Sequence, residues 1–452
     1  MAKKTKAADL SIEEKLEQAL VVPGYEPYKI PDNWCWTSFK NVAEVVTGGT
    51  PSKKHKEYYG NVFPFFKPAD LNTGRNVSIA SEYLSEEGKK VSRVIPAKST
   101  LVCCIGSIGK SGFLEIEGST NQQINSAIPK IEPLYLYYYV NTDCFINQLW
   151  SKSSATTISI VNKTKMEECY FPLAPLPEQQ RIVERIESLF SKLDEAKEKA
   201  QEVIDSFETR KAAILHKAFS GELTAKWRKE NGVGIESWER KTLGEVCNSI
   251  FDGDHMPPPK SETGIPFLVI SNVNDGYLSF ENTRFVPQEY YDAITDTRKP
   301  EKGDVLYTLV GSFGIPVAVD TNAPFCFQRH MALLKPKSIN TYFLWYLLQS
   351  QEMYQKASSI AKGVAQLTVP IKGLRLMDFN CPSEEEQIEI VRVLESMLEK
   401  EGTSKDNAES VIDQIDTMKK AILARAFRGE LGTNDPEEGS AVELLKQILS
   451  GE

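Results

Sequence analysis

The sequence predicts an α+β protein in which two similar mixed α/β modules are separated by two long antiparallel helices that form a coiled coil. Three observations predict this fold class: a long internal repeat, a sustained coiled-coil seam, and paired motifs outside the helices. Residues 176–223 and 384–431 align without a gap and share 22 identical residues of 48. The copies lie 208 residues apart, too far for a solenoid unit, so half of the molecule is duplicated as an internal pseudo-twofold repeat.

The first long helix is predicted over residues 178–219, where apolar positions alternate in steps of four and three. Pro175 and Pro177 precede it and Gly221 follows it, as is typical of helix ends. At 1.5 Å per residue this helix would be roughly 60 Å long. Its seam consists of Ile182, Ile186, Leu189, Leu193, Ala196, Ala200, Val203 and Phe207.

The second long helix repeats this register and is expected to pack antiparallel to the first, because a parallel pair would need a further crossover. Gly402 is expected to loosen or bend it. The two helices either serve only as a structural spacer or also carry partner-binding surfaces. The second seam consists of Ile390, Leu394, Met397, Ala408, Val411, Ile415, Met418 and Ile422.

The repeat extends weakly into the modules, which mix short β-rich runs with one or two helices. Residues 105–109 match 310–314 around a Gly-Ser-x-Gly turn, 121–124 match 327–330, and 135–139 match 342–346. A shared scaffold with different residues at matching positions is expected of two domains that recognise different sequences. The predicted divisions are an N-terminal helical extension (1–30), module 1 (31–175), a first helical region (176–230), module 2 (231–380), a second helical region (381–432) and a C-terminal tail helix (433–452).

Composition excludes several classes of protein. The chain has 452 residues, 41% of them hydrophobic, without an apolar run long enough to span a membrane, and its N-terminus lacks the apolar core of a signal peptide. None of its eight cysteines lies in a Cys-x-x-Cys pair. We therefore expect a cytoplasmic protein with free thiols, and we expect Cys103 and Cys104 to be buried strand residues.

The charge distribution is compatible with nucleic-acid binding, although the net charge is −9. The number of Lys and Arg residues minus the number of Asp and Glu residues is +2 for residues 31–160, zero for 238–377 and −10 for 378–452. The acidity therefore belongs to the second helix and the tail, and near-neutral modules can bind DNA through a local basic face.

Polar, glycine-rich loops in the modules supply candidate contacts to phosphates and base edges. Each of these residues could equally belong to an ordinary solvated turn. For Arg329 and His330 the alternative is a structural ion pair, and for Gln122 and Gln123 it is capping. The DNA-binding candidates are Thr47, Gly49, Thr50, Ser52, Lys53, Lys54, Lys67, Lys110, Gln122, Gln123, Asp254, His255, Asn272, Ser312, Arg329 and His330.

The sequence contains no credible catalytic constellation. A nucleotide-binding loop at residues 106–111 would need glycine at the position of Cys104, so this segment is better explained as a tight strand-to-strand turn. The only proline run, 257–259, lacks the flanking residues of an amino-methyltransferase motif. The four histidines, His55, His216, His255 and His330, show no metal-ligand spacing.

The paired helix ends, Phe219-Ser-Gly-Glu-Leu223 and Phe427-Arg-Gly-Glu-Leu431, together with Leu176-Pro-Glu-Gln-Gln-Arg-Ile-Val183, resemble the DNA specificity subunit of type I restriction-modification systems. The similarity covers essentially the full length. One departure is Ser383-Glu-Glu-Glu-Gln387, where the first copy has Pro175-Leu-Pro-Glu-Gln179, so the second helix start could hold its partner differently.

The resemblance implies a non-catalytic subunit in which each module reads one half of a split DNA site and the coiled coil fixes the gap. Two methyltransferase subunits would dock on the helices and use S-adenosylmethionine, and restriction subunits would use ATP and Mg²⁺; this chain itself would bind no cofactor. The alternatives are an enzyme with an unrecognised active site and a coiled-coil adaptor. The partner-binding candidates are Glu178, Gln179, Phe219, Gly221, Glu222, Glu386, Gln387, Phe427, Gly429 and Glu430.

Overall fold

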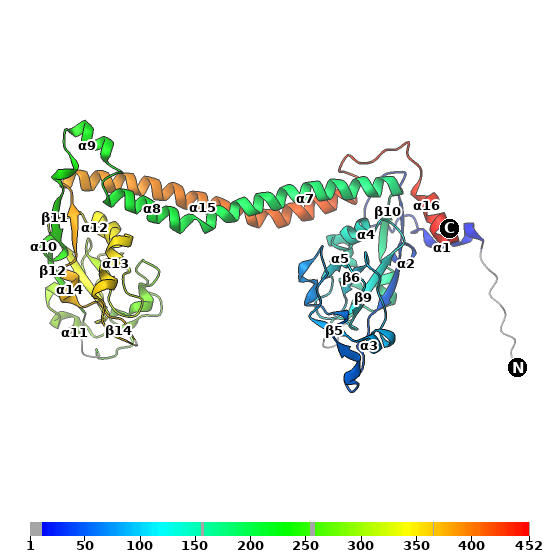
Figure 1. The fold of residues 1–452 in the computed structure, drawn as a ribbon, viewed down its shortest axis with the longest axis horizontal. Coiled ribbons are helices and arrows are strands. Elements are labelled where there is room, and N and C mark those ends of the chain that lie inside the picture. The colour runs from blue at the N-terminus through cyan, green and yellow to red at the C-terminus, as the bar shows by residue number, and fades with distance from the viewer. Residues whose placement is uncertain (1–10, 155–157, 254–257, 365, 452) are drawn as a thin grey trace. The chain divides into compact units, whose positions relative to one another are not determined.

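The computed structural model describes residues 11–154, 158–253, 258–364 and 366–451 (Figure 1). Two compact units are present, each containing one module and parts of the long helices. Unit 1 comprises Met1–Lys199 and Val411–Glu452, and unit 2 comprises Ala200–Ser410. The end of the second long helix and the tail therefore belong to the compact unit of module 1, although they are remote from it in sequence.

Module 1 is built on two small sheets and a group of covering helices. The first sheet has the order β2 (Ala43–Thr47), β9 (Ile124–Pro129), β6 (Thr100–Cys103), β7 (Ser111–Phe113). The second has the order β3 (Tyr59–Gly60), β5 (Glu82–Leu84), β4 (Phe63–Phe66), β8 (Ser119–Thr120). A separate antiparallel pair, β1 (Cys35–Ser38) with β10 (Tyr170–Leu173), closes the module where the first long helix begins.

Module 2 repeats this topology almost strand for strand. Its first sheet has the order β12 (Cys247–Asp252), β18 (Met331–Pro336), β15 (Val305–Thr308), β16 (Pro316–Ala318). The second contains β14 (Arg284–Val286), β13 (Ile265–Leu268) and β17 (Cys326–Phe327), and β11 (Glu239–Thr242) pairs with β19 (Asp378–Cys381). The predicted mixed α/β modules and the repeat between them are confirmed.

The paired hydrogen bonds of the two modules correct one detail of the sequence alignment. The amide of Ile124 donates to Asn121 and that of Met331 donates to Gln328, so Asn121 corresponds to Gln328. The motif comparison had placed Asn121 opposite Phe327, one residue too early. In the corrected register Gln122 corresponds to Arg329 and Gln123 to His330.

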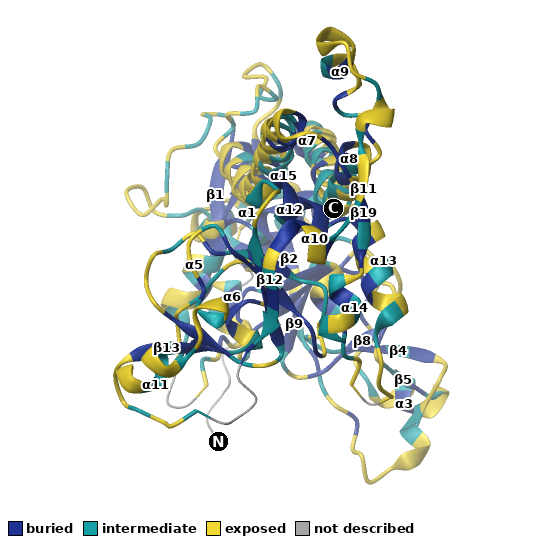
Figure 2. Ribbon diagram, turned by 90° about the vertical axis from the view of Figure 1, so that its left-hand side faces the viewer, coloured by how far each residue is buried: buried dark blue, intermediate teal, exposed yellow. Residues whose placement is uncertain are grey.

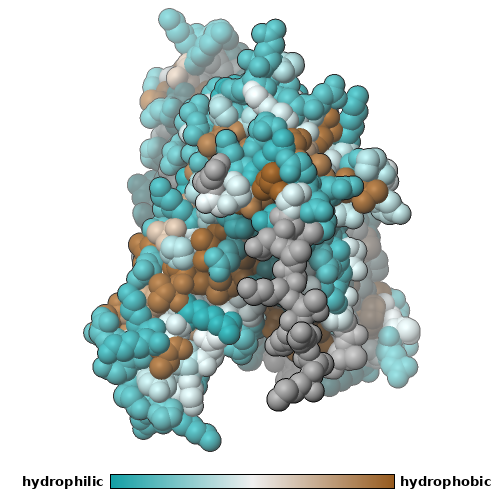
Figure 3. All heavy atoms as spheres, turned by 90° about the vertical axis from the view of Figure 1, so that its right-hand side faces the viewer, coloured by the Kyte–Doolittle hydropathy of each residue, from teal (hydrophilic) through white to brown (hydrophobic). Residues whose placement is uncertain are grey.

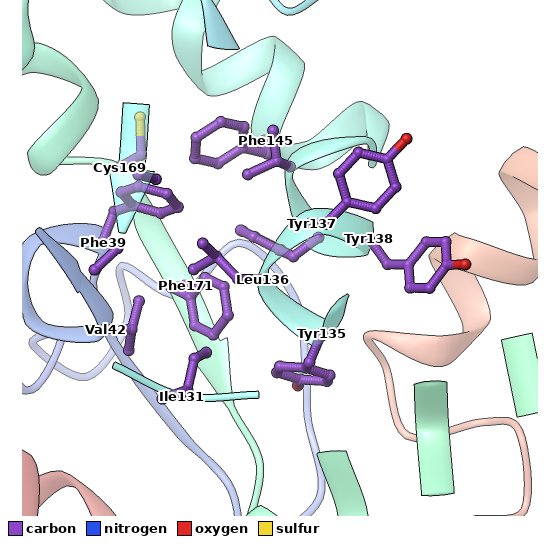
Figure 4. Packing of buried hydrophobic residues seen from close by; sticks show 14 of the residues in the cluster. Phe39, Val42, Ile131, Tyr135, Leu136, Tyr137, Tyr138, Phe145, Cys169 and Phe171 are labelled. Atoms are coloured by element: carbon purple, nitrogen blue, oxygen red, sulfur yellow. The ribbon is translucent and has the colours of Figure 1, made fainter. Parts of the chain in front are cut away.

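Short helices pack over the sheets and bury most of the aromatic residues. In module 1, α4 (Pro133–Val140) and α5 (Asp143–Lys152) cover the first sheet, and Tyr135, Tyr139 and Phe171 form a buried aromatic cluster. Figure 4 shows Tyr135 and Phe171 of this cluster. In module 2, α12 (Thr341–Leu348) and α13 (Gln351–Ile360) occupy the equivalent places. Figure 2 shows the central strands as buried and the loops as largely exposed.

Both long helices form, but the interruption lies in the first helix and not in the second. The predicted helix over 178–219 is divided into α7 (Leu176–Asp205) and α8 (Phe207–Phe219), whereas α15 (Glu384–Ala426) continues without a break through Gly402. The Ser206 hydroxyl donates to the Glu202 carbonyl oxygen at 2.5 Å, but the Ser404 hydroxyl makes the same bond to Lys400 at 2.8 Å inside α15, which continues. At the break the Arg210 guanidinium also donates to the Val203 carbonyl oxygen at 3.1 Å, and a side chain that enters the backbone hydrogen-bond ladder interrupts a helix. Thr403 and Ser404, which follow Gly402, are weak helix formers, so the continuity of α15 there depends on its packing against α8, where Arg210 pairs with Glu401.

The helices pack antiparallel within each unit. In unit 1 the Lys419 ammonium of α15 lies 2.5 Å from the Asp194 carboxylate of α7. In unit 2 the Arg210 guanidinium of α8 lies 2.6 Å from the Glu401 carboxylate of α15. A second contact gives the direction in each unit, since Arg181 donates to the Thr433 carbonyl oxygen in unit 1 and Lys405 lies over the Phe207 ring in unit 2. In both units the residue number falls in the second segment as it rises in the first, which confirms the predicted direction.

Both ends of the described chain pack on unit 1. Helix α1 (Ile12–Ala19) contacts α16 (Ala441–Ser450), and the Ala441 amide donates to the Asn33 carbonyl oxygen at 2.9 Å. Seen from the side of α1 and α16, the surface is mostly hydrophilic with apolar patches between (Figure 3). No helix among the described residues is long and apolar enough to cross a membrane.

Candidate nucleic-acid interface

Four loops converge at one end of module 1: the loop after β2, the loop after β6, the turn before β9 and the loop after α5. The Gly48 amide, after β2, donates to the Ile124 carbonyl oxygen at 2.9 Å, and the Cys104 amide, after β6, donates to the Gln123 carbonyl oxygen at 2.8 Å. The fourth loop, of which Ser154 and residues 158–160 are described, joins them through a β-bridge between Ile105 and Ile160. Backbone hydrogen bonds therefore fix these loops on the ends of three strands of one sheet.

The same four loops converge in module 2 through equivalent bonds. The Gly253 amide donates to the Met331 carbonyl oxygen at 3.2 Å, and the Leu309 amide donates to the His330 carbonyl oxygen at 2.8 Å. A β-bridge joins Val310 to Thr368. We call these two assemblies loop cluster 1 (described residues 48–54, 104–110, 121–123, 154 and 158–160) and loop cluster 2 (described residues 253, 258, 309–315, 328–330, 362–364 and 366–368).

A glycine is required where the loops pass closest. A Cβ atom at Gly48 would lie 2.1 Å from the Asn121 carbonyl oxygen, and one at Gly253 would lie 2.3 Å from the Phe327 carbonyl oxygen. Both obstacles are backbone atoms that cannot rotate away. Gly48 thus allows the turn before β9 to lie against the loop after β2. Gly253 does the same for the turn before β18 and the loop after β12.

The structure brings most of the predicted DNA-binding residues into the two loop clusters. Gly49, Thr50, Ser52, Lys53, Lys54, Lys110, Gln122 and Gln123 belong to loop cluster 1, with Thr47 at its edge, and Ser312, Arg329 and His330 belong to loop cluster 2. Ser52, Lys53 and Lys54 are exposed, which suits contacts to phosphates. Asp254 and His255 lie outside the described residues.

Two predicted residues lie elsewhere and have structural partners. The Lys67 ammonium is 2.8 Å from the Glu82 carboxylate. Asn272 is buried, and its side chain accepts from the Val269 amide and donates to the Glu281 carbonyl oxygen. Asn272 therefore shapes its own turn, and the structure removes it from the set of exposed polar residues.

Sequence reasoning missed the fourth loop of each cluster. The Ser154 and Ile160 backbones pair with each other, and so do those of Lys362 and Thr368. These segments contain no charged motif, so only their equivalent positions after α5 and α13 could have indicated them. Ile158 is 58% exposed, which places an apolar side chain on the outer surface of loop cluster 1.

Glu178 and Glu386, predicted to bind partners, are instead buried at equivalent junctions within the chain. The Glu178 carboxylate accepts from the Trp34 indole at 2.7 Å and from Asn434 at 2.9 Å. The Glu386 carboxylate accepts from the Trp238 indole at 2.8 Å and from Arg228 at 2.6 Å. Burial raises the pKa of Glu178, while its hydrogen bonds from Trp34 and Asn434 oppose the shift.

The neighbouring glutamines have the same role. The Gln179 side chain accepts from the Glu132 amide and donates to the Ala174 carbonyl oxygen. Gln387 accepts from the Asn340 amide and donates to the Pro382 carbonyl oxygen. Both helix starts thus make equivalent bonds to their own module despite the difference between Pro175 and Ser383, and neither glutamine offers a surface to a partner.

At the helix ends most predicted partner-binding residues also face inward. Phe427 is fully buried, with its ring 4.9 Å from that of Tyr135, and Phe219 packs 5.4 Å from Phe343. Gly221 and Gly429 have φ of +84° and +72°, which glycine adopts at low cost after a helix. Glu222 and Glu430 are exposed, so the prediction of partner contacts now rests on these two carboxylates.

Replacing Glu386 by Gln should strongly destabilise unit 2. The Arg228 side chain, 9% exposed, would lose its countercharge, and an unpaired buried charge costs about 3–5 kcal/mol. Urea denaturation followed by tryptophan fluorescence measures the change in the free energy of unfolding. Glu389→Gln is the matched control, because its partner Arg392 has a side chain that is 67% exposed; equal losses in both variants would contradict a structural role for the Arg228–Glu386 pair.

The described residues define a duplicated two-module protein that presents one loop cluster per module, without a group of side chains suited to a metal ion. A family model described as "Type I restriction modification DNA specificity domain" matches residues 31–205 and 235–410. The chain therefore belongs to this family and contains its domain twice.

Relatives and solved structures agree with this assignment. The EcoBI specificity subunit of Escherichia coli is 24% identical over 444 residues, covering 93% of this chain and 92% of that protein. The EcoKI specificity subunit of Escherichia coli K12 is 22% identical over 452 residues, covering 93% and 96%. The HsdS subunit from Thermoanaerobacter tengcongensis has the same fold, with a TM-score of 0.63 and 21% identity over 89% of this chain and 99% of that one.

Proposed function

We propose that this chain is the non-catalytic DNA-recognition subunit of a type I restriction-modification complex, as the names of its relatives indicate. The observation that carries the proposal is the presence of two loop clusters on the same scaffold with different side chains. A scaffold that repeats while its exposed tips differ is suited to reading two different sequences. Each module thus reads one half of a bipartite, asymmetric DNA site.

The electrostatic properties of the loops support contact with DNA. Lys53, Lys54 and Lys56 are exposed along one segment of module 1, and such cations release counterions from DNA when they neutralise phosphates. The small number of such residues keeps non-specific affinity low. Tight binding then requires further protein surface in the complex.

The long helices supply the remaining functions in this proposal. Their paired seams set the gap between the half-sites, and their exposed faces and ends, including Glu222 and Glu430, bind two methyltransferase subunits. Restriction subunits join this assembly. S-adenosylmethionine, ATP and Mg²⁺ are bound by those partners, since this chain carries no recognisable motif for them.

The isolated chain should neither methylate nor cleave DNA, and it should bind DNA weakly and with little sequence preference. Adding the cognate methyltransferase subunits should produce tight, sequence-specific binding. Binding of radiolabelled S-adenosylmethionine and methyl transfer are measured for the chain alone and for the complex, with the methyltransferase subunit alone as control. Methyl transfer by the chain on its own would refute the proposal.

A further inference from the structure

One turn position is exposed in both modules at the centre of the loop clusters. Gln122 lies between β8 and β9, and Arg329 lies between β17 and β18. The residues that follow them, Gln123 and His330, are half-buried, and their carbonyl oxygens accept from the loops after β6 and β15. The backbone at this position is therefore fixed while the side chain points into the open.

Arg329 is an exposed cation that none of the described residues neutralises. Within the described residues no hydrogen bond or ion pair engages its guanidinium. It borders a pocket of about 380 Å³ that His330, Gln366 and Thr368 also line. A guanidinium with five donors and no partner, held at a fixed turn, can donate two parallel hydrogen bonds to a ligand.

Gln122 is oriented by its neighbour. The Thr50 hydroxyl donates to its Oε1 at 2.5 Å, which leaves Nε2 and the second lone pair of Oε1 available to a ligand. A side-chain amide with one donor and one acceptor presented together matches the N7 and N6 edge of adenine. A guanidinium matches the O6 and N7 acceptors of guanine in the same groove.

We infer that this turn position determines base specificity in both modules, with Arg329 reading a guanine and Gln122 reading an adenine in the major groove. The inference rests on the proposed function and deepens it, because it assigns one base in each half-site to one side chain. It follows from the equivalent placement of the two residues, their exposure, and the absence of any ion pair at Arg329 among the described residues.

The test selects bound DNA from a randomised library with the whole complex of this chain and its methyltransferase subunits. Arg329→Gln should replace guanine by adenine at one position of one half-site, and Gln122→Arg should do the reverse in the other half-site. A lost bidentate pair reduces discrimination between the two bases about 5- to 150-fold. Arg329→Lys keeps the charge but not the paired donors, so it should also weaken the guanine preference.

Lys302→Gln is the matched control. Lys302 is exposed and precedes β15, whereas the turn of Arg329 adjoins the other end of that strand. Removal of the Lys302 charge should leave the selected DNA sequence unchanged.

Two results would overturn the inference. If Arg329→Gln weakens binding to all sequences equally and reduces the slope of log affinity against log salt by about 1, Arg329 contacts a phosphate and not a base. A wild-type half-site without guanine would exclude the assignment directly. Failure of the proposed function looks different, since the wild-type complex would then select no two-part sequence at all.

Discussion

Removing seven residues from each long helix is expected to shorten the preferred gap between the half-sites by about 3 base pairs. The deletion of residues 196–202 with 410–416 shortens each helix by roughly 10 Å and keeps the seven-residue seam. Ten base pairs of DNA span about 34 Å. The recognised bases should stay the same, because both loop clusters lie outside the deleted segments, although the accompanying rotation of the DNA could reduce the tolerated change.

The gap is measured by methylating a library of sites whose half-sites are separated by different numbers of base pairs. The control replaces exposed residues of the same segments without changing their length, and it should keep the original optimum. A folded, active deletion variant with an unchanged optimum would show that the helices do not set the gap.

Much of the helical architecture could be predicted from the sequence because the coiled-coil signal is local and periodic. The predicted seam residues Ile182, Ile186, Ile390 and Leu394 are fully buried, as their spacing indicates. Two others, Val411 and Met418, are 42% and 45% exposed, so the seam is not buried along its whole predicted length. The turn at residues 104–110 also forms as expected, between the antiparallel strands β6 and β7. Cys103 and Cys104 are buried, as their apolar neighbours predict.

The interruption at Ser206 could not be predicted with the same rules. Glycine has a lower helical propensity than serine, so Gly402 is the expected weak point, yet the break coincides with the bond from the Arg210 guanidinium to the Val203 carbonyl oxygen. Which of the two competing local effects prevails depends on packing around each residue. That packing is not encoded in the propensities.

The buried glutamates show why recurring motifs are ambiguous. Glu178 and Glu386 recur because each anchors a tryptophan of its own module, Trp34 and Trp238, from more than 140 positions away. A repeated motif indicates that a residue matters in both halves. It does not distinguish an internal hydrogen bond from a contact with a partner.

The loop clusters needed the structure for a related reason. Their segments are separated by up to about 110 residues and meet through backbone hydrogen bonds, the close approach at Gly48 and Gly253, and in loop cluster 1 the bond from Thr50 to Gln122. The residues on the turns, including Gln122 and Arg329, could be chosen as polar candidates. Their equivalence required the strand register, which shifted the motif alignment by one position.

Exchange of one module should change one half of the recognised site completely and leave the other half as it was. Residues 31–175 are replaced by the corresponding module of a relative, because this range includes both β1 and its partner β10 and ends before α7. Each module has its own core and its own loop cluster, so the exchange leaves loop cluster 2 intact. The control is a chain that keeps its own residues 31–175 but has them joined through the same junctions as the exchanged module.

Mapping the DNA methylated by the complex that contains the exchanged chain shows whether each module reads its own half-site. The expected result is a split motif with one new half, one original half and an unchanged gap. A motif in which both halves change together would contradict it.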